Sequence, residues 1–320
     1  MSSEAMSPMK EYVARQSEAR LDRFAYELGR GCKSTDADTV HDLRVSIRRY
    51  ESCVDAFNGF FPPRPVRKFD KRLREILKPA GIVRDRDIAL QLASDAGLTP
   101  DTPLVRGLSK QRQELAKRFQ EDVKRWSKRN PSDKWRRRLV VSSHMDRRGS
   151  AKSTWDPTRT SSENAAVVLP SLTQKFFNRG LKLIQVKTPD KKLHDFRLRA
   201  KRFRYTLELF KPCYGPTLDK HITAVRRLQD HLGTMNDCAA TLALLRRPGL
   251  REQQGARRLR DALKRRITSE RADLFAYWES HFAGEGVGQR WMGYLERYAG
   301  RVAMPQGRST AALAADRMSA

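Results

Sequence analysis

Two segments of this sequence carry a histidine and several cations at the same spacing. Val40–Phe57 and Leu193–Phe210 align when they are compared at a separation of 153 positions. Solvation alone needs no particular cation at a given position. Cations that recur at equivalent positions of the two segments therefore favour a shared binding function. Arginine suits phosphate because its planar guanidinium presents paired N–H donors to two oxygens. The matching cations are His41, Arg44, Arg48 and Arg49 in the first segment, and His194, Arg197, Lys201 and Arg202 in the second.

Each segment is expected to form an amphipathic helix. At about 100° per residue, the apolar side chains share one arc, and the histidine and the next two cations lie opposite. Arg49 and Arg202 fall at the margin, and Arg204 joins the basic face of the second copy. Positions i, i+3 and i+7 follow one helix face, which suits a linear chain of phosphates. For the two histidines, phosphate contact and a structural hydrogen bond are both open. We interpret Asp42 and Asp195, in the first helical turns, as structural.

The basic face continues onto the next predicted helix of each copy. In the first copy four cations follow i, i+4, i+7 and i+11 as one stripe, whereas Ala224 interrupts the second stripe. Arg84-Asp85 is predicted to open a further helix, where a carboxylate favours the helix dipole and Arg84 can point into the same groove. The second copy has Asn236-Asp237 there, so we expect the copies to contribute unequally. The added candidates are Arg67, Lys71, Arg74, Lys78, Arg84, Arg204, Lys220 and Arg227.

The charge of the whole chain indicates a polyanionic partner. Its 320 residues include 65 Lys and Arg against 37 Asp and Glu, a formal net charge of +28. Such a surplus repels itself in a compact protein, so nucleic acid, an anionic membrane and inorganic polyphosphate are candidate partners. No run approaches the roughly 18 apolar residues of a membrane span, and the N-terminus lacks a signal peptide. Four cysteines without a CxxC pair are typical of reduced thiols, so we expect a cytoplasmic protein.

The apolar periodicity predicts an all-α fold with an internal duplication. Residues recur at i, i+3, i+4 and i+7 along most of the chain, and no segment alternates like a strand. We divide the chain into a first half (1–146), a linker (147–162), a second half (163–283) and a C-terminal extension (284–320) that we expect to be partly disordered. Helices are predicted near 8–29, 37–58, 66–80, 83–96, 102–129 and 131–143, and near 163–185, 190–211, 216–232, 236–247 and 251–282.

Motifs for a phosphate loop, a metal site and single-stranded nucleic acid are weaker in this sequence. Gly29–Ser34 resembles a phosphate loop, but its spacing is wrong and no strand precedes it, which favours a helix C-terminal turn. The histidines and cysteines lack zinc-ligand spacing, and no carboxylate cluster is present to hold catalytic metal ions. We therefore expect no catalysis, no metal and no cofactor. Trp126 and Trp135 alternate with cations, as in proteins that bind single-stranded nucleic acid, but packing of helix ends is the favoured interpretation.

The duplicated segments resemble the CHAD family, the conserved-histidine α-helical domain. Val40–Arg49 and Leu193–Arg202 carry the first signature, and Leu73–Gly81 and Leu228–Gly233 are similar to the second, so the resemblance covers about residues 8–282. Ala80 departs from the leucine that is usual there. The resemblance implies two tandem antiparallel four-helix bundles related by a pseudo-twofold axis, with a basic groove where they meet. It also implies binding of inorganic polyphosphate and location on polyphosphate granules, without catalysis.

The combined expectation is electrostatic binding of inorganic polyphosphate in a basic groove between the bundles. Polyphosphate-metabolising enzymes are a further expected partner. The family is often fused to a triphosphate-tunnel hydrolase with a Glu-x-Glu-x-Lys strand motif, and the absence of that motif favours a stand-alone binding protein. The alternatives are an RNA-binding protein, which shares the charge, and a polyphosphate-processing enzyme.

Overall fold

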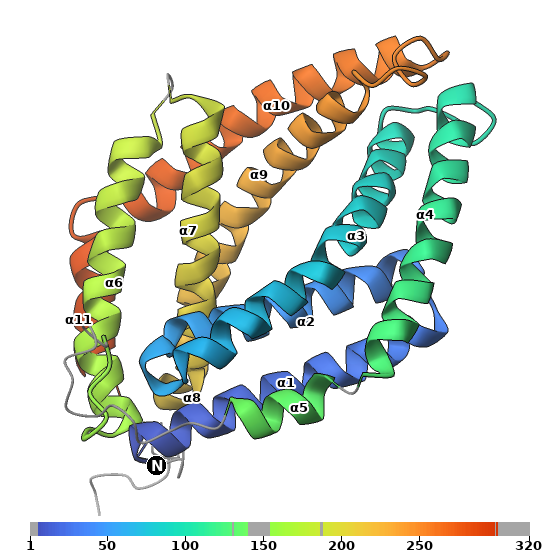
Figure 1. The fold of residues 1–320 in the computed structure, drawn as a ribbon. Coiled ribbons are helices and arrows are strands. Elements are labelled where there is room, and N and C mark those ends of the chain that lie inside the picture. Colours follow the sequence, from blue (N-terminus) through green and yellow to red (C-terminus); the bar gives the residue numbers. More distant parts are fainter. Residues whose placement is uncertain (1–5, 130, 140–153, 186–187, 298, 300–320) are drawn as a thin grey trace, which may run out of the picture.

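The computed structural model describes residues 6–129, 131–139, 154–185, 188–297 and 299. Every named element in these ranges is a helix, which confirms the all-α class. In the first half, α1 packs on α2 and α4, and α3 packs on the same two helices, which closes a bundle (Figure 1). The short α5 lies along α1. These helices are α1 (Met9–Lys33), α2 (Ala37–Ala56), α3 (Pro63–Asp95), α4 (Pro103–Ser127) and α5 (Pro131–Arg138), with a 3-10 turn at Asn58–Phe60.

The second half repeats most of this packing and differs in the helix that completes it. Helix α7 lies between α6 and α9, whereas α10 packs on α9 and α11 packs on α6. The last of these helices falls in the segment that the sequence assigns to a C-terminal extension, and its Trp291 and Leu295 are buried. The helices are α6 (Ser161–Leu183), α7 (Asp190–Leu209), α8 (Lys211–Tyr214), α9 (Leu218–Leu244), α10 (Ala256–Trp278) and α11 (Val287–Arg297), with a 3-10 turn at Gly215–Thr217 and a π turn at Glu279–Ala283.

The predicted breaks inside α3 and α9 are wrong, because each is one continuous helix. A glycine inside a helix costs only about 1 kcal/mol relative to alanine, and buried apolar neighbours offset that cost at Gly81 and Gly233. Pro79 also lies inside α3, where it removes a backbone hydrogen bond and favours a kink. Figure 1 shows α3 changing direction along its length. Asp85 is therefore a mid-helix residue, so its assignment to the positive end of a helix is wrong.

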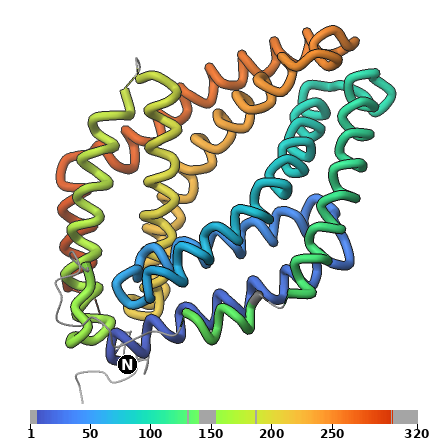
Figure 2. The backbone as a smooth tube through the Cα atoms, viewed as in Figure 1, coloured from blue at the N-terminus to red at the C-terminus, as the bar shows by residue number. Residues whose placement is uncertain are grey.

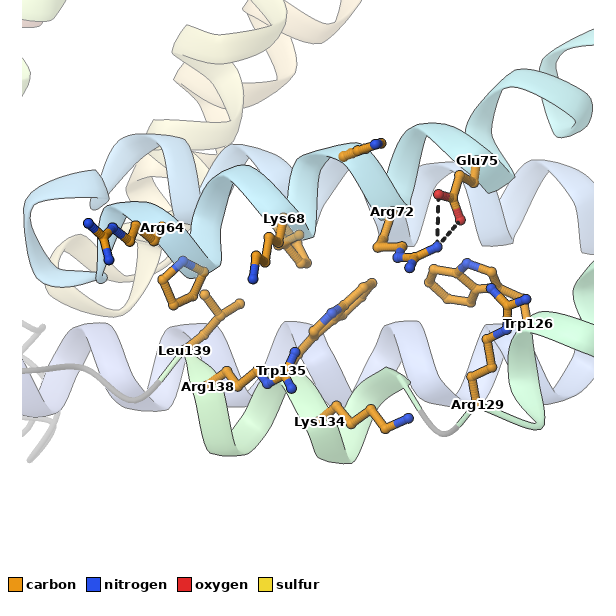
Figure 3. A pocket seen from close by; sticks show the side chains of 13 residues that line it. Arg64, Lys68, Arg72, Glu75, Trp126, Arg129, Lys134, Trp135, Arg138 and Leu139 are labelled. Atoms are coloured by element: carbon orange, nitrogen blue, oxygen red, sulfur yellow. Dashed lines mark hydrogen bonds and ion pairs between the residues drawn. The ribbon is translucent and has the colours of Figure 1, made fainter.

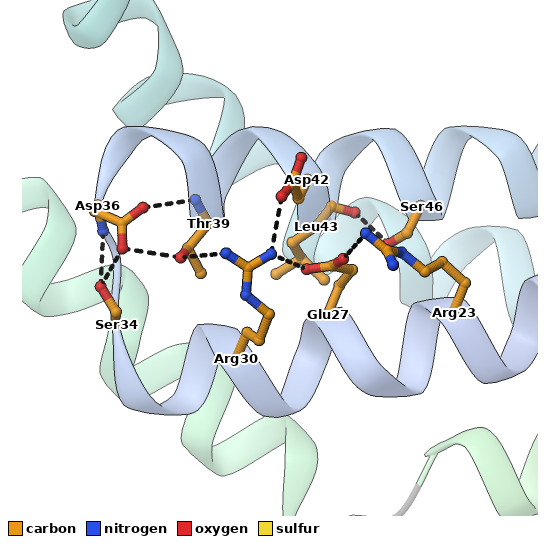
Figure 4. A network of polar contacts seen from close by, with 9 residues as sticks. All are labelled: Arg23, Glu27, Arg30, Ser34, Asp36, Thr39, Asp42, Leu43 and Ser46. Carbon is orange, nitrogen blue, oxygen red and sulfur yellow. Dashed lines mark hydrogen bonds and ion pairs between the residues drawn. The ribbon is translucent and has the colours of Figure 1, made fainter.

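A polar network fixes α2 against α1 (Figure 4). Asp36 caps α2 by accepting a hydrogen bond from the Thr39 N–H at 2.7 Å. Hydrogen bonds from Ser34 and from that N–H lower the pKa of Asp36 to about 2. Arg30 then joins the helices by donating to Asp42 at 2.8 Å. Asp42 is thus structural, as the sequence predicts, and the network directs the opposite face of α2 towards the second half.

The two halves share their apolar cores at both ends of the molecule. At one end Trp155 is buried, stacks on Phe210 at 4.7 Å, and donates its indole N–H to the carbonyl of Ala56 at 2.6 Å. Within the described part of the predicted linker, Trp155 is therefore a core residue, and residues 147–153 lie outside the described ranges. At the other end the α3–α4 and α9–α10 connections lie side by side (Figure 2), and Arg266 donates to Asp95 at 2.7 Å.

The tryptophans of the basic stretch are core residues. Trp126 and Trp135 are both 7% exposed, and both rings pack against Phe24. This confirms that they pack helix ends.

Candidate functional site

The two repeated helices meet at the middle of the molecule. Helix α2 contacts α7, and the two long helices that follow them, α3 and α9, contact each other. This junction brings together the basic faces of both copies. We call the residues there the central cluster, which consists of His41, Arg44, Arg48, Arg84, Asp85, His194, Arg197, Lys201, Asn236 and Asp237.

Arg44 lies across the surface of α3. Its Nη1 donates to the carbonyl of Leu77 at 3.1 Å, and a Cβ atom built on Gly81 would lie 3.0 Å from that nitrogen. The side chain is half-buried, and desolvation together with the charge of Arg48 lowers the pKa of Arg44. Arg44 makes no ion pair among the described residues, so its charge is available to an anion.

The two histidines at equivalent positions, His41 and His194, have different neighbours. Nδ1 of His194 lies 2.8 Å from Oδ1 of Asn236, which makes the ring N–H the donor. At the equivalent position of the first copy, His41 has Arg84 beside it. Desolvation and the charge of Arg84 lower the pKa of His41, so the ring is held towards its neutral form until an anion offsets Arg84.

Arg197 and Lys201 form the contribution of α7. Nε of Arg197 is buried without a hydrogen-bond partner among the described residues, and desolvation lowers the pKa of this guanidinium. Desolvation and the neighbouring Arg197 lower the pKa of Lys201 to about 8, with a smaller effect from Arg48 across the junction. Neither residue has an ion pair within the ranges that the structure describes. This pair is therefore a concentration of positive charge that no ion pair in the described ranges neutralises, although Asp237 partly offsets it through space.

Two carboxylates lie among the cations of the candidate site, a place that the sequence did not predict for them. Asp237 acts electrostatically on Arg44, Arg197 and Lys201, and it also faces Asp85. Partial desolvation raises the pKa of Asp85, against the lowering effect of Arg44. Their equivalence in the two copies was visible in the sequence. Because both were assigned to helix starts, their position among the cations was not predicted. Both carboxylates act on the neighbouring cations through space, without an ion pair among the described residues.

A second missed feature is a pair of arginines beyond the carboxylates. Arg86 and Arg247 both line a cavity of about 260 Å³ between α3 and α9, and also an adjacent cavity of about 270 Å³ bounded by α4. Nε of the buried Arg86 donates to Gln111 at 3.2 Å. Desolvation and the charge of Arg247 lower the pKa of Arg86. Neither arginine has a cationic equivalent in the other copy, so the duplication gave no signal for them.

Several candidates are held by protein partners. Arg49 lies 3.6 Å from the carboxylate of Glu208, an ion pair that joins α2 to α7. Arg204 donates to that same Glu208 and to Gln229, both at 2.7 Å, and its side chain is only 12% exposed. Arg48 pairs with Glu51 at 2.9 Å but remains 55% exposed. Arg49 and Arg204 therefore belong to the joint between the halves as much as to a ligand surface.

Other candidates face different surfaces. Arg202 lines a groove between α6 and α7, and Lys71 lines a pocket between α3 and α5. Arg227 acts on Tyr277 of α10, so it lies on the far side of α9. The remaining stripe residues are exposed on α3 or α9 and have no ion pair among the described residues; they are Arg67, Arg74, Lys78 and Lys220.

No cluster of metal-ligating side chains occurs in the part of the chain that the structure describes. In the same part, every helix is too short or too polar to cross a bilayer.

Comparisons with known proteins agree with this architecture. The crystal structure of the CHAD domain from the plant Ricinus communis superposes with a TM-score of 0.69 at 18% identity, and the match covers 87% of this chain and 93% of that one. PptA from Streptomyces chartreusis gives a TM-score of 0.55 at 13% identity, over 89% of this chain and 99% of that one. Among curated proteins, none matches this sequence. At these identities the structural likeness establishes the fold alone.

The fold and the central cluster define an all-α protein whose duplicated basic helices meet at one junction. The CHAD domain family matches residues 15–246, most of the chain, and this chain belongs to that family.

Proposed function

We propose that this protein binds inorganic polyphosphate at the central cluster and does so without catalysis. The observation that carries the proposal is a set of half-buried cations without ion pairs among the described residues, namely Arg44, Arg197 and Lys201. A desolvated charge without a partner destabilises a fold, so such a set is expected where a ligand supplies the counter-charge. Family membership supports the same ligand.

The proposed mechanism is electrostatic. Successive phosphates accept charge-assisted hydrogen bonds from guanidinium and ammonium groups on α2 and α7, and counterions leave the polyanion as it binds. Asp85 and Asp237 repel phosphate, so the chain is expected to follow the cations around them. We further propose that Arg67, Arg74 and Lys78 extend this path along α3, which makes the first copy the larger contributor.

Inorganic polyphosphate fits the cluster better than RNA does. Single-stranded RNA is recognised largely by stacking of bases on aromatic rings, and the rings in the cluster are only the imidazoles of His41 and His194. Beside the cluster, the ring of Tyr205 is covered by the guanidinium of Arg204 at 4.8 Å. A chain of phosphates needs only the cations that are there.

We also propose that the halves are two four-helix bundles related by a pseudo-twofold axis, and that the protein collects on polyphosphate granules. The equivalent positions of His41 and His194, and of Asp85 and Asp237, support the symmetry. A tagged copy of the protein should form foci in cells that contain polyphosphate and none in cells that lack it.

Competition separates the two ligands. Labelled polyphosphate bound to the protein should be displaced by unlabelled polyphosphate, and much less by RNA at an equal concentration of phosphate groups. Equal displacement by RNA would contradict the proposal. Release of orthophosphate from long-chain polyphosphate, with magnesium or manganese supplied, would contradict the absence of catalysis.

A further inference from the structure

A large pocket lies between α3 and α5, on a face of α3 distinct from the one that Arg44 covers (Figure 3). Its volume is about 810 Å³, which is within the usual size of small-molecule sites. Seven cations line it, among them Lys68, Arg72 and Lys134, against a single carboxylate, Glu75. Of those cations only Arg72 has an ion pair within the described residues, with Glu75 at 3.0 Å. The pocket therefore attracts anions independently of the central cluster.

The floor of this pocket is aromatic. Trp126 and Trp135 line it together with Phe69, and Figure 3 shows Trp135 between α3 and α5 and Trp126 near Arg72 and Arg129. Trp135 meets Phe69 edge to face at 4.5 Å, so the rings are fixed by the core behind them. A rigid apolar floor offers nothing to inorganic phosphate. Each indole is 7% exposed, so what it offers to a flat organic ring is an apolar contact at its accessible part.

We propose that the α3–α5 pocket binds a nucleotide moiety, with the base against the accessible part of the indoles and the phosphates among the cations of the rim. The proposal goes beyond polyphosphate binding and does not depend on it. Aromatic rings combined with a basic rim are the usual combination for such ligands. The moiety can come from a free nucleoside triphosphate or from a single strand of nucleic acid.

The test compares ligands that share phosphates and differ in the base. The full-length protein carries Arg44→Glu and Arg197→Glu, which remove the competing central cluster. ATP, tripolyphosphate, adenosine and a hexa-adenylate strand are titrated by calorimetry and by tryptophan fluorescence. ATP or the strand should bind at least about tenfold more tightly than tripolyphosphate and quench the fluorescence, and Trp135→Phe should remove most of the quenching. Tighter binding by ATP assigns a free nucleotide, and tighter binding by the strand assigns nucleic acid.

Location is tested by matched charge reversals. Lys68→Glu with Lys134→Glu should weaken nucleotide binding by about a hundredfold, since both side chains are exposed and line the pocket. Lys110→Glu with Lys117→Glu changes the net charge equally on the exposed side of α4 and should leave the affinity within about threefold. Equal affinity for ATP and tripolyphosphate overturns the proposal, as does equal weakening by the two double variants.

Discussion

Arg44 and Gly81 are in direct contact, whereas Gly233, the equivalent of Gly81 in the second copy, has open space around it. A Cβ atom on Gly81 would lie 3.0 Å from Nη1 of Arg44, and one on Gly233 would meet nothing within 4 Å. The absence of a side chain at position 81 thus allows the guanidinium to lie against α3 and face the junction. The two glycines occupy the same place in the duplicated pattern but have different consequences for the site.

Gly81→Leu should therefore weaken polyphosphate binding. A leucine side chain would displace the guanidinium of Arg44, and loss of one charge-assisted contact lowers the affinity by about tenfold. Gly233→Leu is the matched control, with the same change of residue in a continuous helix and no neighbour to displace. Affinity measured by fluorescence polarisation with labelled polyphosphate should fall in the first variant alone. Equal effects of the two substitutions would argue against a ligand role for Arg44.

Binding should weaken as the pH rises through 8. The pKa of Lys201 is about 8 in the free protein, and bound phosphate favours the charged amine and so raises that pKa. Lys201 therefore takes up a proton on binding at and above pH 8, and the affinity should fall by at most about tenfold per pH unit until the pKa of the complex is reached. Calorimetry in buffers of different ionisation enthalpy measures the proton uptake.

Lys201→Arg is the control for this pH effect. Arginine keeps the positive charge and does not titrate in this range, so the variant should bind with nearly constant affinity between pH 7 and 9. A wild-type profile that is flat over the same range would show that Lys201 does not meet the ligand.

Arg204→Met should reduce stability more than binding. The substitution leaves Glu208 and the buried Gln229 without the donor that they share, which costs about 1–3 kcal/mol of unfolding free energy. Polyphosphate affinity of the folded variant should stay within about threefold, because this guanidinium is held by protein partners. Urea unfolding monitored by circular dichroism measures the free energy of unfolding. Arg202→Met, at an exposed position, should change stability by less than about 0.5 kcal/mol.

Asn236→Arg should increase the affinity. The substitution gives the second copy the cation that Arg84 supplies in the first, and a further charge-assisted contact corresponds to about a three- to tenfold gain. Asn236→Ala removes the hydrogen bond to His194 without adding charge, so it should produce no gain. If the arginine variant binds no more tightly than the alanine variant, the path of the polyanion does not pass this position.

The sequence was sufficient to predict the helices and the cations that face the junction. Period and duplication determine which side of α2 and α7 is apolar, and Arg44, Arg197 and Lys201 therefore fall where the sequence places them. Residues at the margin of the basic helix face were less predictable. Arg49 and Arg202 are equivalent in sequence, yet one pairs with Glu208 and the other lines the α6–α7 groove, because neighbouring helices decide the direction of a marginal side chain.

The sequence was a poor guide where local signals and tertiary packing disagree. Pro79 and Gly81 are helix-ending residues by propensity, but α3 continues through them because its buried face extends on both sides. That continuity places Asp85 among the cations. Arg86 and Arg247 are near each other only because the α3–α4 and α9–α10 ends share a core, which no local pattern records.

The most direct test of the central claim is the affinity of the Arg44→Glu, Arg197→Glu double variant for polyphosphate. The double variant Lys110→Glu, Lys117→Glu is the control, because it changes the net charge by the same amount. Circular dichroism verifies that both variants are folded. The account predicts at least about a hundredfold loss of affinity in the first variant, with a reduced dependence on salt, and little change in the second. Unchanged affinity in a folded Arg44→Glu, Arg197→Glu protein would contradict the assignment of the central cluster as the binding site.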